Sequence, residues 1–265
     1  MNIHSRKKEI KWKEAIIKAI EECGGVATLK ELYKTVPKIK GISPNPRNFH
    51  IIRGFLTRMA RYTQEIQRIG LGTYALLGIK IKSTIEKWQR EGNNVLALDK
   101  IPSQQLHSAI EGMLLELGNI YGYLTYTPDL CGMFNGKPLS AFANLEKLPQ
   151  FTSSQLERII KNIDVLWFKK RALITVPKHA FEIERTTNFI NALNRFYQLR
   201  DFQMNFYIIS SPNKMTQFKQ KIRIDPYREF AEKIHFRSFE SIVSLYKIAL
   251  EHFEMKEKII TNIPE

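Results

Sequence analysis

The sequence predicts an α/β protein in two parts: a small basic N-terminal module and a larger domain with a central mixed β-sheet flanked by helices. Three observations indicate this. Within the first 80 residues, three amphipathic helical segments precede two short strands around a glycine turn. From residue 103 onward, helical and strand-like segments alternate, as in α/β domains. Residues 1–90 hold 19 Lys and Arg against 7 Asp and Glu, whereas the remainder is nearly balanced in charge.

The N-terminal module is predicted from apolar periodicity and from residues that start or stop helices. Thr28 can cap the second helix, which we expect to end before Pro37 because the residue before a proline disfavours helical backbone. Gly70 and Gly72 supply the flexible backbone of a tight turn between two strands. The expected ranges are 9–23, 28–36 and 47–62 for the helices, and 65–69 and 73–77 for the strands.

Three helices followed by a hairpin resemble a winged helix-turn-helix domain, and the resemblance covers residues 8–79. It implies that the third helix enters the major groove and that the hairpin lies along the backbone of double-stranded DNA. The formal net charge of +15 and the pI near 9.7 favour such a phosphate-rich partner. The alternative is that the charged face of the third helix is exposed to solvent and contacts no DNA. The residues predicted to contact DNA are Arg47, His50, Arg53, Arg58, Arg61 and Arg68.

The predicted domains are residues 1–80, a helical connector over 81–102, and a second domain over 103–265. In the second domain we expect helices at 103–117, 153–162, 188–199, 215–222 and 239–253, with Gly118 ending the first. Expected strands are 120–127, 163–168, 180–185, 204–210 and 235–236. The two cysteines lack metal-ligand spacing, and neither a leader nor a membrane-length apolar run is evident, so we expect a cytoplasmic protein without a membrane partner.

Three carboxylates interrupt strands that are otherwise apolar. Asp164 lies in the predicted strand 163–168, and Glu182 and Glu184 lie in the next, 180–185. Burying an unpaired charge is costly, so something must offset it. The period of two places Glu182 and Glu184 on one face. If the strands pair, the acids converge, and Mg²⁺ is the natural neutraliser because it prefers hard oxygen ligands. The alternative is a solvated edge strand with Asp164 as a strand-end cap.

This pattern resembles the PD-(D/E)XK nuclease superfamily, which includes most type II restriction endonucleases. Asp164 matches its first acid and Glu182 its second, while Glu184 stands where lysine is usual, as in the Glu-Xaa-Glu version. Ile163 replaces the usual preceding proline. The resemblance implies that Asp164 and Glu182 hold Mg²⁺ and that Glu184 orients or deprotonates the attacking water.

Three further acidic residues, Asp129, Glu111 and Glu116, are candidates for the site. A literal Pro128-Asp129 pair exists, but the strand after it offers no suitable third member, so we reject it as the motif while allowing Asp129 to approach the site. The superfamily also commonly places a Glu or Gln on the helix before the sheet. Glu111 and Glu116 are the candidates, and their five-residue spacing prevents them from sharing one role. We favour Glu111 as the fourth catalytic residue.

The function predicted is that of a type II restriction endonuclease that hydrolyses double-stranded DNA site-specifically with Mg²⁺. Cutting both strands of a short palindrome needs two active sites, so a homodimer is expected. A cognate DNA methyltransferase encoded nearby would accompany such an enzyme. The alternatives are a nonspecific, repair or mobile-element nuclease, and a DNA-binding regulator with an inactive nuclease-like domain.

Overall fold

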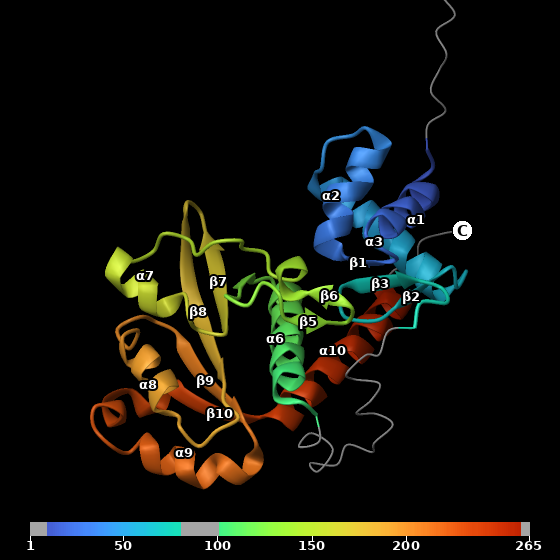
Figure 1. Cartoon of the computed structure of the whole chain (residues 1–265). Helices are drawn as coiled ribbons and strands as arrows, with labels where there is room; N and C mark the ends of the chain where they lie inside the picture. The colour runs from blue at the N-terminus through green and yellow to red at the C-terminus, as the bar shows by residue number, and fades with distance from the viewer. Residues whose placement is uncertain (1–9, 81–100, 261–265) are drawn as a thin grey trace, which may run out of the picture. The chain divides into compact units, whose positions relative to one another are not determined.

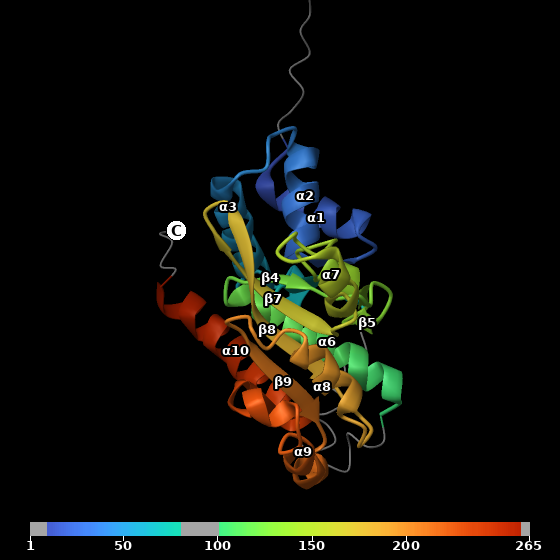
Figure 2. The same cartoon turned by 90° about the vertical axis from the view of Figure 1, so that its left-hand side faces the viewer.

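The computed structural model of the chain describes residues 10–80 and 101–260 (Figures 1 and 2). The chain forms two compact units, Met1–Ile81 and Lys82–Glu265. The predicted connector over 81–102 lies almost entirely outside the described residues. Among the helices that the structure describes, none is both long and apolar enough to cross a membrane.

The first unit combines helices with an antiparallel sheet of order β1-β3-β2. Apolar faces of all three helices meet in one core, in which Ile16, Leu32 and Leu56 are completely buried. The sequence does not predict β1, because three residues are too few to show an alternating pattern. The elements are α1 (Trp12–Glu22), β1 (Val26–Thr28), α2 (Leu29–Lys40), α3 (Pro46–Arg61), β2 (Ile66–Arg68) and β3 (Thr73–Leu76).

The prediction that the second helix ends before Pro37 is wrong. Helix α2 continues to Lys40, and Val36 and Pro37 are both buried in it. The helix ends at Gly41, which adopts the left-handed conformation with φ of 67° and donates its N–H to the carbonyl of Lys38. Burial of this turn and the glycine cap outweigh the proline's missing N–H. At the other end, Thr28 and Glu31 form the reciprocal capping box of the helix.

The second unit is an α/β domain around a mixed sheet of order β10-β9-β8-β7-β4. Strands β8, β9 and β10 run parallel, whereas β7 is antiparallel to both β8 and β4. The mixed sheet flanked by helices confirms the predicted fold class of this part. Its elements are α6 (Ser103–Ile120), β4 (Leu124–Tyr126), β5 (Met133–Phe134), β6 (Lys137–Pro138), α7 (Ser154–Ile160), β7 (Val165–Arg171), β8 (Ile174–Ile183), α8 (Ile190–Tyr197), β9 (Asn205–Ser210), α9 (Met215–Lys221), β10 (Ile234–Ser238) and α10 (Phe239–Ile260), with 3₁₀ turns at Leu139–Ala141, Pro212–Lys214 and Tyr227–Lys233.

Helices cover both faces of this sheet (Figure 1). On one face α8 and α9 close a core in which Phe168, Phe206 and Ile208 of the strands meet Leu193 and Phe196 of α8. On the other face α6 packs against β4, β7 and β8 and is itself crossed by α10. The sheet is therefore fixed from both sides, and side chains at its end are held by elements of both layers.

Gly118 does not end its helix as predicted, because α6 continues through it to Ile120. A Cβ at this position would lie 2.7 Å from Nε1 of Trp167 and 2.5 Å from Cγ2 of Thr125. The glycine therefore permits a close approach of α6 to β4 and β7. Sequence periodicity cannot distinguish this role from a helix stop, because both require the absence of a side chain.

Candidate metal centre

Helix α6 presents two polar side chains toward the sheet. His107 and Glu111 are four residues apart and therefore lie on one face of the helix. The Glu111 side chain is only 1% exposed. Its Oε1 accepts a hydrogen bond of 3.2 Å from Thr127 Oγ1. Its Oε2 is also buried and has no hydrogen-bond partner among residues 10–80 and 101–260. A buried carboxylate with an unsatisfied oxygen is expensive unless a proton or a cation accompanies it.

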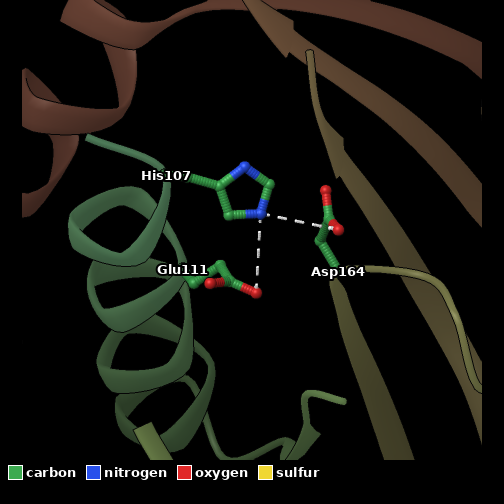
Figure 3. A group of neighbouring side chains, drawn as sticks. All are labelled: His107, Glu111 and Asp164. Carbon is green, nitrogen blue, oxygen red and sulfur yellow. Dashed lines mark ion pairs between the residues drawn. The ribbon is translucent and has the colours of Figure 1, made fainter. Parts of the chain in front are cut away.

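Asp164 meets this pair from the residue immediately before β7. Its Oδ1 lies 3.6 Å from Nε2 of His107, and the same nitrogen lies 3.8 Å from Oε1 of Glu111. Figure 3 shows the imidazole of His107 between the two carboxyl groups. One ligand atom from each residue lies within 4.8 Å of the others, as the ligands of a single metal ion would. The other Asp164 oxygen, Oδ2, accepts the backbone N–H of Ile183 at 2.7 Å.

The hydrogen bond to Ile183 explains how Asp164 is positioned. Strands β7 and β8 are antiparallel with Val165 opposite Phe181, so Asp164 lies beside the end of β8 that carries Glu182. Asp164 thus acts partly as the strand-end cap considered as the alternative, while its second oxygen faces the histidine. Both interpretations describe one side chain, because each carboxylate oxygen has its own partner.

Glu182 is buried at the end of β8 and is held by a cation from α8. Nε and Nη2 of Arg195 donate to its two oxygens at 2.5 and 2.6 Å, the forked geometry of a guanidinium on a carboxylate. Burial raises the pKa of Glu182 to about 8, against the opposing effect of Arg195. Glu182 in turn raises the pKa of Arg195. The Glu182 carboxylate is therefore satisfied by arginine in this structure, and its predicted role as a metal ligand stays a prediction.

Glu184 follows the last residue of β8 and is half-buried. Its backbone N–H donates to the carbonyl of Ile209, and its own carbonyl accepts from Ser210 Oγ, which fixes the main chain beside β9. Burial raises the pKa of its carboxyl group, and the charge of Asp164 raises it further. Its side chain is engaged by Thr186 Oγ1 at 3.5 Å. Glu184 therefore lies within the electrostatic range of the site while remaining accessible.

The close approach of the charges also perturbs the two residues of α6. Burial by itself lowers the pKa of His107, but hydrogen bonding and the charges of Asp164 and Glu111 outweigh it and raise the pKa to about 9. Burial raises the pKa of Glu111 to about 8, although His107 opposes the shift. Strongly perturbed groups gathered at one point are typical of functional sites, although structural ion pairs produce them too.

The two remaining acidic candidates lie differently. The Oδ1 atom of Asp129 accepts the backbone N–H groups of Cys131 and Gly132 at 3.1 and 2.8 Å, as a loop-capping residue does. Its charge nevertheless contributes to the raised pKa of His107, so it approaches the site. Glu116 is buried and accepts a hydrogen bond from the hydroxyl of Tyr246 in α10. Of the two glutamates on α6, Glu111 is thus the one beside Asp164.

The sequence alone does not indicate two residues of this cluster. His107 has no ligand spacing from another histidine or cysteine, so the usual sequence signs of a metal site are missing. The signal was its four-residue spacing from Glu111, which puts both on one helical face. Arg195 offers no comparable signal, because only the packing of α8 on the sheet brings it to Glu182.

In the first unit, the predicted DNA-contacting residues lie on α3 and β2. They differ in their exposure to solvent and in their contacts within the protein. Four of them are exposed along α3: Arg47, His50, Arg53 and Arg58. Arg53 donates to the hydroxyl of Tyr33 and lies over its ring. Arg61 is partly exposed at the end of the helix. Arg68 donates to the carbonyls of Gly70 and Leu71, so it secures the turn of the hairpin.

The fold and the site together define an α/β protein with a candidate centre for a divalent cation. A family model described as the type II restriction enzyme NmeDI C-terminal domain matches residues 90–263. The chain belongs to this family and is a restriction endonuclease-like protein. No curated protein and no solved structure matches it significantly.

Proposed function

We propose that the protein is a type II restriction endonuclease that hydrolyses phosphodiester bonds in double-stranded DNA at a specific sequence, with Mg²⁺ as its cofactor. The observation that carries this proposal is the meeting of Asp164 with Glu111 and His107 at one end of the β7–β8 hairpin, beside Glu182 and Glu184. Membership of a restriction-enzyme domain family supports the same activity. The antiparallel pairing of the acidic strands supports the assignment to the PD-(D/E)XK superfamily.

The donors present fit a divalent cation. Glu111 Oε1 and Asp164 Oδ1 both lie near Nε2 of His107, and the other Glu111 oxygen is buried without a partner among the described residues. Asp164 and Glu111 would hold the ion, with Glu182 as a further predicted ligand beside them. A divalent ion bound there supplies charge that polarises the scissile phosphate and lowers the pKa of a bound water.

The chain's own residues have separate tasks in this proposal. Glu184, half-buried and accessible, orients the attacking water or accepts its proton. Arg195 keeps the Glu182 carboxylate in place at the end of β8. The backbone N–H of Ile183 orients Asp164 so that one oxygen stays directed at the site. The carboxylates thus need little rearrangement when a phosphate arrives, which is the physical basis of a preorganised site.

For the first unit we propose a winged helix-turn-helix domain that binds the DNA. Its three helices and the β2–β3 hairpin, in a sheet of order β1-β3-β2, support this proposal. Helix α3 would enter the major groove with Arg47, His50, Arg53, Arg58 and Arg61, while Arg68 stabilises the hairpin that lies along the backbone. A dedicated DNA-reading unit favours a site-specific enzyme over a nonspecific nuclease.

A plasmid cleavage assay tests the proposed function. Purified protein with Mg²⁺ is expected to cut plasmid DNA into discrete linear fragments, and EDTA is expected to abolish cutting. A smear would indicate the nonspecific nuclease, and intact DNA under all divalent ions would favour the regulator with an inactive domain. Two cuts at a palindrome require two sites, so we propose a symmetric dimer. A gene for a cognate DNA methyltransferase is expected beside this one.

Neutralising the exposed arginines of α3 should weaken DNA binding. The double variant Arg47→Gln/Arg58→Gln removes two exposed charges from this helix. If both contact phosphate, the slope of log affinity against log salt falls by about 2, and affinity at low salt falls about tenfold or more. Fluorescence anisotropy on a duplex without metal measures both quantities. The matched control Lys11→Gln/Lys18→Gln removes two exposed charges near α1. Equal losses of DNA affinity in the two variants would contradict a special role of α3 in the DNA interface.

A further inference from the structure

The donor set at the site includes a nitrogen as well as oxygens. Nε2 of His107 lies 3.6 Å from Asp164 Oδ1 and 3.8 Å from Glu111 Oε1. Protein ligands at roughly 2.0–2.2 Å from one ion lie roughly 3.0–3.6 Å from each other in tetrahedral or octahedral coordination. The two separations that involve Nε2 are close to this range, and all three donor atoms lie within 4.8 Å of one another, so an inward movement would bring them to a common ion.

A hydrogen bond holds the carboxylate of Glu111 and another holds that of Asp164, and His107 lies between them (Figure 3). His107 and Glu111 share one face of α6, and Thr127 Oγ1 holds one oxygen of Glu111. The Ile183 N–H holds the opposite oxygen of Asp164. The other Glu111 oxygen, Oε2, is buried and has no partner among the described residues, so the carboxylate that presents Oε1 to the cluster is only partly satisfied by the protein. The imidazole is thus part of a prearranged group, because its neighbours are held on both sides.

We propose that His107 is a nitrogen ligand of a mixed site with Glu111 and Asp164, and that the site consequently binds a first-row transition-metal ion such as Mn²⁺ ahead of Mg²⁺. Imidazole is a good ligand for first-row transition metals, whereas Mg²⁺ favours oxygen ligands and keeps several waters. Mn²⁺ accepts the two carboxylates as readily as Mg²⁺ does. This inference rests on the proposed metal-dependent function and adds to it a ligand and a metal preference.

Electron paramagnetic resonance of Mn²⁺ added to the EDTA-treated full chain tests the inference without DNA. Pulsed spectra of the wild type are expected to show ¹⁴N coupling from a bound imidazole, and Mg²⁺ is expected to displace Mn²⁺ only in large excess. In His107→Gln the coupling should disappear and the affinity for Mn²⁺ should fall about tenfold or more. Loss of a residue that only hydrogen-bonds to a metal ligand typically costs about tenfold or more, and loss of a ligand itself should cost at least as much. The affinity for Mg²⁺ should change far less, which a competition titration measures.

The matched control is His252→Gln, which alters an exposed histidine of α10 and should keep both the coupling and the preference. Urea unfolding of His107→Gln verifies that the variant is folded. If it is not, the wild-type ¹⁴N spectrum alone decides. A wild type without ¹⁴N coupling, or a folded His107→Gln with an unchanged preference for Mn²⁺, overturns the inference. Plasmid cleavage separates the two proposals: nitrogen-coupled Mn²⁺ without cutting contradicts the nuclease function and leaves the metal site standing. Cutting without nitrogen coupling contradicts the proposed histidine ligand and leaves the nuclease function standing.

Discussion

Asp164→Asn is expected to reduce DNA cleavage about 10³-fold or more while leaving DNA affinity without metal unchanged. The amide oxygen of asparagine can still accept the N–H of Ile183, so the local structure is retained. The substitution removes the negative charge that would hold the divalent ion, and metal stabilisation of the transition state is worth several kcal/mol, where each 1.4 kcal/mol corresponds to about tenfold in rate. Timed plasmid cleavage at saturating Mg²⁺ measures the rate.

Two matched aspartate variants complete this experiment. Asp201→Asn alters an exposed residue and should cut like the wild type. Asp129→Asn alters the residue of the literal Pro128-Asp129 pair, whose carboxylate caps a loop and only approaches the site. It should lose much less activity than Asp164→Asn. If Asp129→Asn loses more activity than Asp164→Asn, Asp129 is the first acid of the motif. Full activity of Asp164→Asn would reject the proposed site.

Removing Arg195 is expected to produce the largest loss of stability among the site residues. Arg195→Met leaves the Glu182 carboxylate, whose side chain is 1% exposed, without the cation that contacts both its oxygens. Breaking a buried ion pair from one side typically costs about 3–5 kcal/mol. Urea unfolding measures the change. The control Arg228→Met breaks the exposed pair with Asp225, whose side chains are 70% and 67% exposed, and should stay close to the wild type.

The loss in Arg195→Met should also depend on pH. Burial raises the pKa of Glu182 in the folded protein, against the effect of Arg195, so the unfolded chain releases the Glu182 proton at a lower pH and stability falls as the pH rises above about 4.5. Without Arg195 the pKa of Glu182 rises further, so this fall continues to higher pH than in the wild type. In Glu182→Gln/Arg195→Met the buried charge is gone, so part of the stability should return. A double variant no more stable than Arg195→Met would show that the arginine acts by packing alone.

Local patterns in the sequence were sufficient to predict the α/β class, the mixed sheet and the two strands whose ends carry the acids, although Asp164 and Glu184 lie one residue outside them. Single carboxylates in apolar strands are recognisable because burial without compensation is costly, which made Asp164 and Glu182 stand out. Element ends were predicted less well. Pro37 lies inside α2 and Gly118 inside α6 because burial and close helix–sheet contact override the usual preferences of these residues.

The composition of the site depended on contacts between elements that are distant along the chain. His107 reaches Asp164 only because α6 packs closely on the sheet, and Arg195 reaches Glu182 only because α8 covers the opposite face. The periods of 3.6 and 2 in a sequence indicate on which face of a helix or strand a side chain lies. They do not indicate which other helix or strand will pack against that face. The acidic residues of the hairpin were therefore predictable from the sequence, while the histidine and arginine beside them were decided by packing.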